Sequence, residues 1–122
     1  MVRIGLIELA LGALLGWAMV VREEKPEWLR RIGVVAPQRI RQVHLDYVMM
    51  GLILIGVGLA VPDLPTVAAV ALVFGTAINP FLFVPLAFDP DAEKRAWYRL
   101  LAVVSFLGVS GSLVVAAIVG PG

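Results

Sequence analysis

The segment Arg39–Gly58, RIRQVHLDYVMMGLILIGVG, decides the fold of this chain. It begins with cationic residues, continues as a long apolar run, and carries His44, the single histidine of the sequence. A helix that passes from positive charge into a run of this length is typical of a transmembrane span that starts at the cytoplasmic side. We therefore predict that the rest of the chain forms a membrane scaffold around this segment.

The composition outside this segment supports the same fold. Of 122 residues, 61% are hydrophobic and only 16% are charged, which is more apolar than a soluble domain of this size can bury in one core. Four segments have about the length that crosses roughly 30 Å of hydrocarbon. The sequence predicts an all-α, polytopic membrane protein: one domain, residues 1–122, with four transmembrane helices in an antiparallel bundle, at about residues 4–21, 38–61, 64–88 and 91–119.

The charges are distributed unequally between the two sides of the predicted bundle. Residues 22–43 contain six Lys or Arg and residues 89–99 contain three, whereas the other side has only Arg3. Because cytoplasmic loops carry an excess of Lys and Arg, both charged loops are predicted to be cytoplasmic. We therefore expect a multi-pass protein of the cytoplasmic (inner) membrane with both termini outside. The lipid bilayer is its expected surrounding, and nucleic acid is not expected as a partner.

Glycine and proline mark faces and breaks in the predicted helices. His44, Gly51 and Gly58 repeat every seven residues, so they lie on nearly one stripe of the second helix, with Tyr47 beside His44. The histidine is therefore expected to point toward a face with room against it. In the third span, Pro80 and a second proline five residues later predict an interruption of the inner half.

His44 is a candidate ligand of haem iron. A neutral imidazole is a suitable axial ligand, and the chain has no cysteine for a thiolate site or a covalent haem attachment. Gly51 is expected to supply space for the macrocycle, and Arg39 and Arg41 are expected to pair with its propionates. The alternative interpretation is an interfacial histidine that is solvated by water and lipid headgroups.

The remaining polar groups of the spans are few. Asn79 is expected in the inner half, where it would share a pocket with His44, or else would form an interhelical hydrogen bond beside the break. Glu8 is expected in the outer half, in a different network, either as a proton-relay or substrate group or as a protonated carboxyl bonded across helices. Asp46 is expected to pair with a nearby arginine at the helix boundary, unless it has a functional role. Met50 is expected either to offer its thioether to iron or to fill the core.

The order of these residues is similar to that in a known family. The segment H-L-D-Y-V-M-M-G, residues 44–51, followed by an apolar helix and F-G-T-A-I-N, residues 74–79, resembles the hydroxylaminobenzene mutases and their relative styrene oxide isomerase. Members of that family are small four-helix membrane proteins with a histidine at the head of helix two. The resemblance covers about forty residues in two helices, while the other two helices agree only in length and hydrophobicity.

The resemblance implies haem b bound non-covalently through His44 at an interface between the protomers of a homotrimer. It implies an isomerisation in which ferric iron acts as a Lewis acid on a small apolar substrate. The chain departs from the family at Met50, where members have Asn, and at Gly75 and Phe83, where the isomerase has an acidic residue and a tyrosine. On this basis we expect Asn79 and Tyr47 to be catalytic, His44 to bind the metal, and the cofactor to be bound by Arg39, Arg41, Tyr47, Met50 and Gly51.

Two other functions remain open on the sequence. One is a non-catalytic membrane scaffold, partner subunit or haem carrier or sensor that packs through its glycine faces. The other is a small transporter or proton-conducting protein that uses Glu8 and Asp46, although these two groups are expected in opposite halves of the membrane.

Overall fold

The structure, a computed structural model, describes all residues from 1 to 122. It contains helices only, and four stretches are long and apolar enough to cross a membrane. These are α1 (Val2–Glu24), α3 (Gln38–Ala60), α4 (Thr66–Phe81) with α5 (Phe83–Phe88), and α6 (Ala96–Val119). The prediction of an all-α, multi-pass membrane protein with four spans is confirmed.

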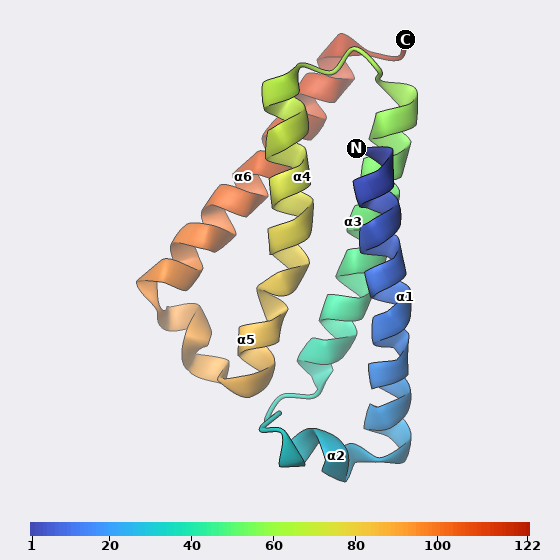
Figure 1. Cartoon of the computed structure of the whole chain (residues 1–122). Coiled ribbons are helices and arrows are strands. Elements are labelled where there is room, and N and C mark those ends of the chain that lie inside the picture. The colour runs from blue at the N-terminus through green and yellow to red at the C-terminus, as the bar shows by residue number, and fades with distance from the viewer.

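The four spans form two pairs. α1 packs along α3 in the most extensive contact of the molecule, α4 packs along α6, and α3 joins the two pairs through α4 and α5. Figure 1 shows this order across the molecule, with α6 and α1 on opposite sides. The buried face of α3 therefore lies between α1 and α4, and the buried face of α4 lies between α3 and α6.

The two ends of the molecule differ in charge. Both termini and the turn between α3 and α4 lie at one end (Figure 1), where the amide of Gly122 donates to the carbonyl of Ala60 over 3.2 Å. The two segments rich in Lys and Arg, residues 22–43 and 89–99, lie at the other end. The two charged loops thus lie on the same side, because the chain crosses the molecule twice between them.

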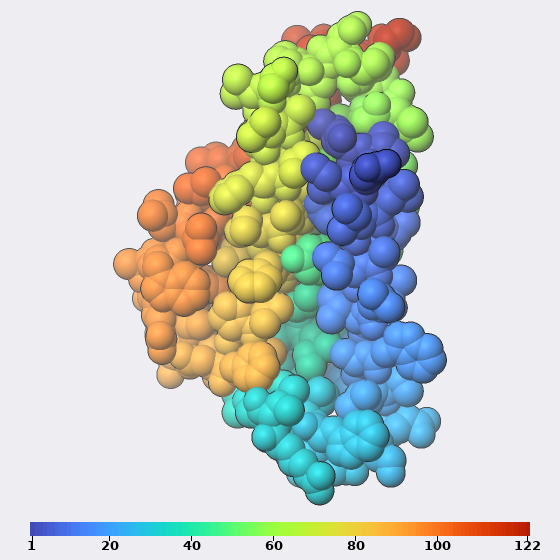
Figure 2. All heavy atoms as spheres, in the orientation of Figure 1, coloured from blue at the N-terminus to red at the C-terminus, as the bar shows by residue number.

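A short helix, α2 (Pro26–Arg31), closes the charged end. Its Leu29 packs with Val34 and Ala87, and the amides that follow, of Val35 and Ala36, donate to the carbonyl of Ala87 over 2.8 and 3.0 Å. Figure 2 shows this segment packed beneath the adjoining ends of the long helices. The loop between the first two spans is therefore held against α5.

The third span is interrupted as its prolines predict. α4 contains Pro80 and ends at Phe81, Leu82 separates the two helices, and α5 contains Pro85. The hydroxyl of Tyr98, a buried residue of α6, donates to the carbonyl of Leu82 over 2.9 Å. A side chain from the neighbouring helix thus bonds the backbone where the helical pattern breaks.

The fourth span begins later than predicted. Residues Pro90–Lys94 form a short 3-10 helix, η1, whose first turn is capped by the Asp89 side chain, which accepts from the Asp91 amide over 3.0 Å. Arg95 is extended, so α6 starts only at Ala96. The predicted start at residue 91 was wrong because the Asp-Pro-Asp sequence caps a separate short turn.

Most of the apolar surface faces outward. Only 23 of the 122 residues are buried, and large apolar side chains such as Leu59, Val67 and Ile118 are at least 71% exposed. The residues that are buried between helices are few and centre on Leu54 and Leu72. Side chains of this kind need hydrocarbon around them, which the lipid bilayer supplies.

Candidate functional site

His44 lies on α3 against the glycine face of α1. Its ring is half-buried, and a Cβ added at Gly16 would come within 3.5 Å of the ring carbon Cε1. The ring nitrogen Nδ1 donates a hydrogen bond to the carbonyl of Gly12. A carbonyl only accepts, so Nδ1 carries the proton, and a ring protonated at Nδ1 alone presents Nε2 with a free lone pair.

The stripe of glycines beyond His44 is closed by α1. A Cβ added at Gly51 would lie 2.7 Å from the amide nitrogen of Leu9, and one at Gly58 would lie 2.7 Å from Cγ2 of Val2. These glycines let the two backbones approach closely. The expectation that Gly51 supplies space for a macrocycle is therefore wrong within this chain, because α1 already occupies that space.

Met50 and Tyr47 face α4 and not the histidine ring. Met50 is partly buried against the core formed by Leu54 and Leu72, so it fills the interior as a flexible apolar side chain. The hydroxyl of Tyr47 donates to the carbonyl of Ala77 over 2.9 Å and joins α3 to α4.

Asn79 lies on the opposite side of α4, toward α6. Its side-chain oxygen accepts a hydrogen bond from the hydroxyl of Ser105 over 3.0 Å. His44 bonds to α1 and Asn79 bonds to α6, so the expectation that they share one inner pocket is wrong. The interhelical bond beside Pro80, the alternative drawn from the sequence, is the arrangement that the structure contains.

The arginines at the start of α3 lie outside every ion pair. Arg39 donates to the side chain of Gln42 over 2.8 Å, and Arg41 is exposed. The structure contains two ion pairs, and both lie around η1, so Asp46 is not paired with an arginine either. Arg39 and Arg41 therefore remain available to an anionic group at the charged end.

Glu8 is bonded across helices, which is one of the two arrangements that the sequence left open. It is 3% exposed, its Oε2 lies 2.9 Å from the hydroxyl of Thr76, and its Oε1 is buried without a hydrogen-bond partner. Thr76 precedes Ala77, whose carbonyl accepts from Tyr47, so Glu8 belongs to the polar contacts between α1, α3 and α4. The sequence signal for this contact is Glu8 itself, a single acid within an apolar span.

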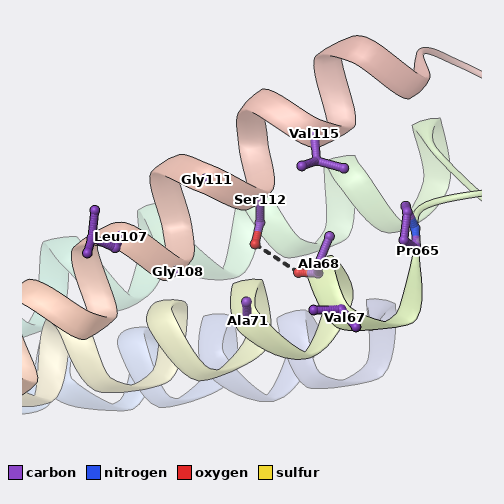
Figure 3. A pocket seen from close by; sticks show the side chains of 9 residues that line it. All are labelled: Pro65, Val67, Ala68, Ala71, Leu107, Gly108, Gly111, Ser112 and Val115. Atoms are coloured by element: carbon purple, nitrogen blue, oxygen red, sulfur yellow. Dashed lines mark hydrogen bonds between the residues drawn. The ribbon is translucent and has the colours of Figure 1, made fainter.

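The hollows of the surface lie away from these polar groups. A groove of about 400 Å³ runs between α4 and α6, and Figure 3 shows the hydroxyl of Ser112 bonded across it to the carbonyl of Ala68, over 2.8 Å. None of the four hollows in the chain is lined by His44, Tyr47 or Glu8. A ligand larger than a few atoms at His44 would therefore need walls from outside this chain.

Comparison with known proteins finds no relative of this chain. The chain matches no family model, no curated protein and no solved structure.

Proposed function

We propose that this protein binds haem b in the membrane, with Nε2 of His44 as the axial ligand of the iron. The observation that carries the proposal is the hydrogen bond from Nδ1 to the carbonyl of Gly12. Histidines that bind metals commonly donate their second ring nitrogen to a carbonyl or carboxylate, which fixes the tautomer and the ring orientation. Haem, when bound, would supply an iron centre that polarises a substrate oxygen as a Lewis acid.

The residues fit haem in part. The His44 ring is oriented by its bond to Gly12, and Arg39 and Arg41 are free of carboxylate partners and lie on the same helix toward the charged end, where propionates would meet them. The space at Gly51 does not fit, since α1 covers it. We therefore place the macrocycle outside the α1–α3 pair, at an interface between protomers, with a homotrimer as the proposed assembly.

The proposed chemistry is an isomerisation of a small apolar substrate, as in the family that residues 44–51 and 74–79 resemble. Tyr47 and Asn79, the proposed catalytic groups, hold hydrogen bonds within the chain, to Ala77 and Ser105. Any substrate role would have to break or share those two bonds. Haem binding is therefore the better supported part of the proposal, and catalysis is its second part.

The optical spectrum of the protein tests haem binding. Protein expressed with ample haem and purified in mild detergent should be coloured, and His44→Ala should lose the Soret band. Free imidazole should restore part of that band in His44→Ala, because the small ligand can replace the missing ring. Ser112→Ala, which is changed far from the histidine, should keep the band. A colourless wild-type protein, or an unchanged spectrum in His44→Ala, contradicts the proposal.

Conversion of aryl epoxides or aryl hydroxylamines by the coloured protein tests catalysis. Product formation that is lost in His44→Ala supports an isomerase. If the coloured protein converts neither class, haem binding stands and the proposed isomerase activity is contradicted. A carrier or sensor role then replaces that activity.

A second candidate function is a non-catalytic subunit that packs against other helices. Gly56 and Gly111 favour it, because a Cβ added at either would meet nothing within 4 Å, and both residues are exposed on the spans. Gly5, Gly12 and Gly51, by contrast, already contact the neighbouring helix inside the chain, so they cannot bind a partner helix. If this function is correct, Gly111→Leu should change the oligomeric state in detergent while the haem content stays at zero in all variants.

A further inference from the structure

Glu8 is the most completely buried ionisable group of the bilayer region. It lies on α1, it faces Thr76 of α4, and only 3% of the residue is exposed. One of its oxygens, Oε2, has a hydrogen-bonding contact, and the other, Oε1, has none. A carboxylate offers about four acceptor sites, so a single contact leaves a buried charge almost unsolvated.

No cation compensates such a charge. Glu8 takes part in no ion pair, and Arg3, the nearest cation along α1, is exposed. On α3, the proton on Nδ1 of His44 is directed to Gly12, and the single carboxyl residue of that helix is the half-buried Asp46.

The remaining groups packed around Glu8 offer no further donor. The Tyr47 hydroxyl of α3 is directed to the carbonyl of Ala77. α4 contributes Thr76 and contains no titratable or charged residue, so the hydroxyl of Thr76 is the single polar group that reaches the carboxyl.

The hydroxyl of Thr76 has two acceptors in reach and one proton. Its Oγ1 lies 2.9 Å from Oε2 of Glu8 and 3.1 Å from the carbonyl of Val73. With a charged Glu8, one of these two short contacts lacks a proton. With a neutral Glu8, the carboxyl proton on Oε2 is donated to Oγ1, and the threonine proton is donated to Val73, so both contacts are hydrogen bonds.

We propose that Glu8 is a proton-binding site inside the membrane, in which the neutral carboxyl donates to Thr76 and Thr76 donates to the backbone of Val73. The proposal is independent of haem binding, since neither Glu8 nor Thr76 is hydrogen-bonded to His44. Its ligand is the proton, and the site also reacts with apolar reagents that need a protonated carboxyl.

The chemical signature of such a site is reaction with a hydrophobic carbodiimide. The carboxyl O–H adds across one C=N bond of the reagent: the carboxyl oxygen bonds to the central carbon, the proton moves to nitrogen, and nothing leaves. Migration of the acyl group to nitrogen then gives a stable N-acylurea that retains the whole reagent. Glu8 is 3% exposed, so the reagent must reach the carboxyl from lipid when the contact between α1 and α4 opens transiently.

Dicyclohexylcarbodiimide applied to the protein in liposomes near neutral pH tests the proposal. We expect a mass gain of one reagent molecule, mapped to Glu8 and absent in Glu8→Gln. Asp46→Asn is the matched control. It should retain the adduct on Glu8, because Asp46 has no hydrogen bond of the kind that joins Glu8 to Thr76. Equal labelling of Glu8→Gln overturns the proposal, and where no adduct forms the infrared band of the acid decides it.

Infrared spectroscopy separates a protonated site from a merely reactive one. At neutral pH the wild-type protein should show the C=O band of a neutral carboxylic acid, shifted in D2O and absent in Glu8→Gln. In Thr76→Val the band should move to higher frequency, because Oε2–H loses its acceptor. Loss of carboxylate bands in Glu8→Gln, with no acid band in the wild type, overturns the proposal. Gln has nearly the same size and can donate to Thr76, so this variant is expected to fold.

Discussion

The two helix pairs close in the same way and differ in what they leave unpaired. α1 and α3 approach through Gly5, Gly12 and Gly51, and α4 and α6 approach through Gly75 and Gly108. Between α4 and α6 the polar side chains are paired with one another or with the backbone, as for Ser105 with Asn79 and Ser112 with Ala68. The α1–α3 pair instead leaves Oε1 of Glu8 buried without a partner and engages only one nitrogen of His44.

This difference indicates where chemistry belongs in the molecule. A polar group whose hydrogen bonds are all made inside the protein stabilises the contact and has little left for a ligand. A polar group in the membrane with an unused acceptor costs free energy, so it marks a functional site. The α1–α3 pair therefore carries His44 and Glu8, the two groups with unused atoms, whereas the bonds of Asn79, Ser105 and Ser112 stay within the α4–α6 pair.

The largest effect is expected where an added side chain overpacks the contact between α1 and α3. Gly51→Ala places a Cβ 2.7 Å from the backbone nitrogen of Leu9, so α1 must move away from α3. We expect a loss of about 3 kcal/mol in the free energy of unfolding, together with the loss of colour, because the bond between His44 and Gly12 depends on this contact.

Gly75→Ala is the matched variant in the other pair. Its Cβ would lie 2.6 Å from the carbonyl oxygen of Ser105, so it should destabilise the protein to a similar degree while retaining the Soret band per folded molecule. Gly111→Ala, which meets nothing within 4 Å, should be neutral. Denaturation in mixed micelles, followed by absorbance and circular dichroism, measures all three. Equal loss of colour in the variants of Gly51 and Gly75 would contradict the division between the pairs.

An intermediate effect is expected where Tyr98 bonds the interrupted helix. Tyr98→Phe leaves the carbonyl of Leu82 without the hydroxyl that now donates to it inside the protein. We expect a loss of about 1–2 kcal/mol in unfolding free energy. Tyr47→Phe removes the half-buried bond between the two pairs and should cost less, about 1 kcal/mol. The same denaturation assay compares them, and a larger loss for Tyr47→Phe would show that the pairs depend on that contact.

The smallest effect is expected for Ser112→Ala. This change removes one hydrogen bond to the carbonyl of Ala68 between α6 and α4, and such bonds in membrane proteins contribute about 0.6 kcal/mol. Haem content and Glu8 labelling should both stay unchanged. A change in either would mean that the α4–α6 pair contributes to the candidate sites, which removes the contrast between the pairs.

The sequence by itself determined the features that depend on composition along the chain. The four spans, the charged loops at one end and the break between Pro80 and Pro85 all follow from hydrophobic length, charge and proline chemistry. Each of these is a local property, because the cost of burying charge or of losing a backbone donor is set by the residue itself.

Only the tertiary structure decided which faces meet. It placed α1 over Gly51, turned His44 toward Gly12 and Asn79 toward Ser105, and brought Glu8 to Thr76 across 68 positions of the chain. The physical reason is that a helix in lipid gains little hydrophobic free energy from one rotation over another, so the close approach of backbones at small residues sets the pairing. That approach joins residues far apart in sequence, and no spacing along one helix encodes it.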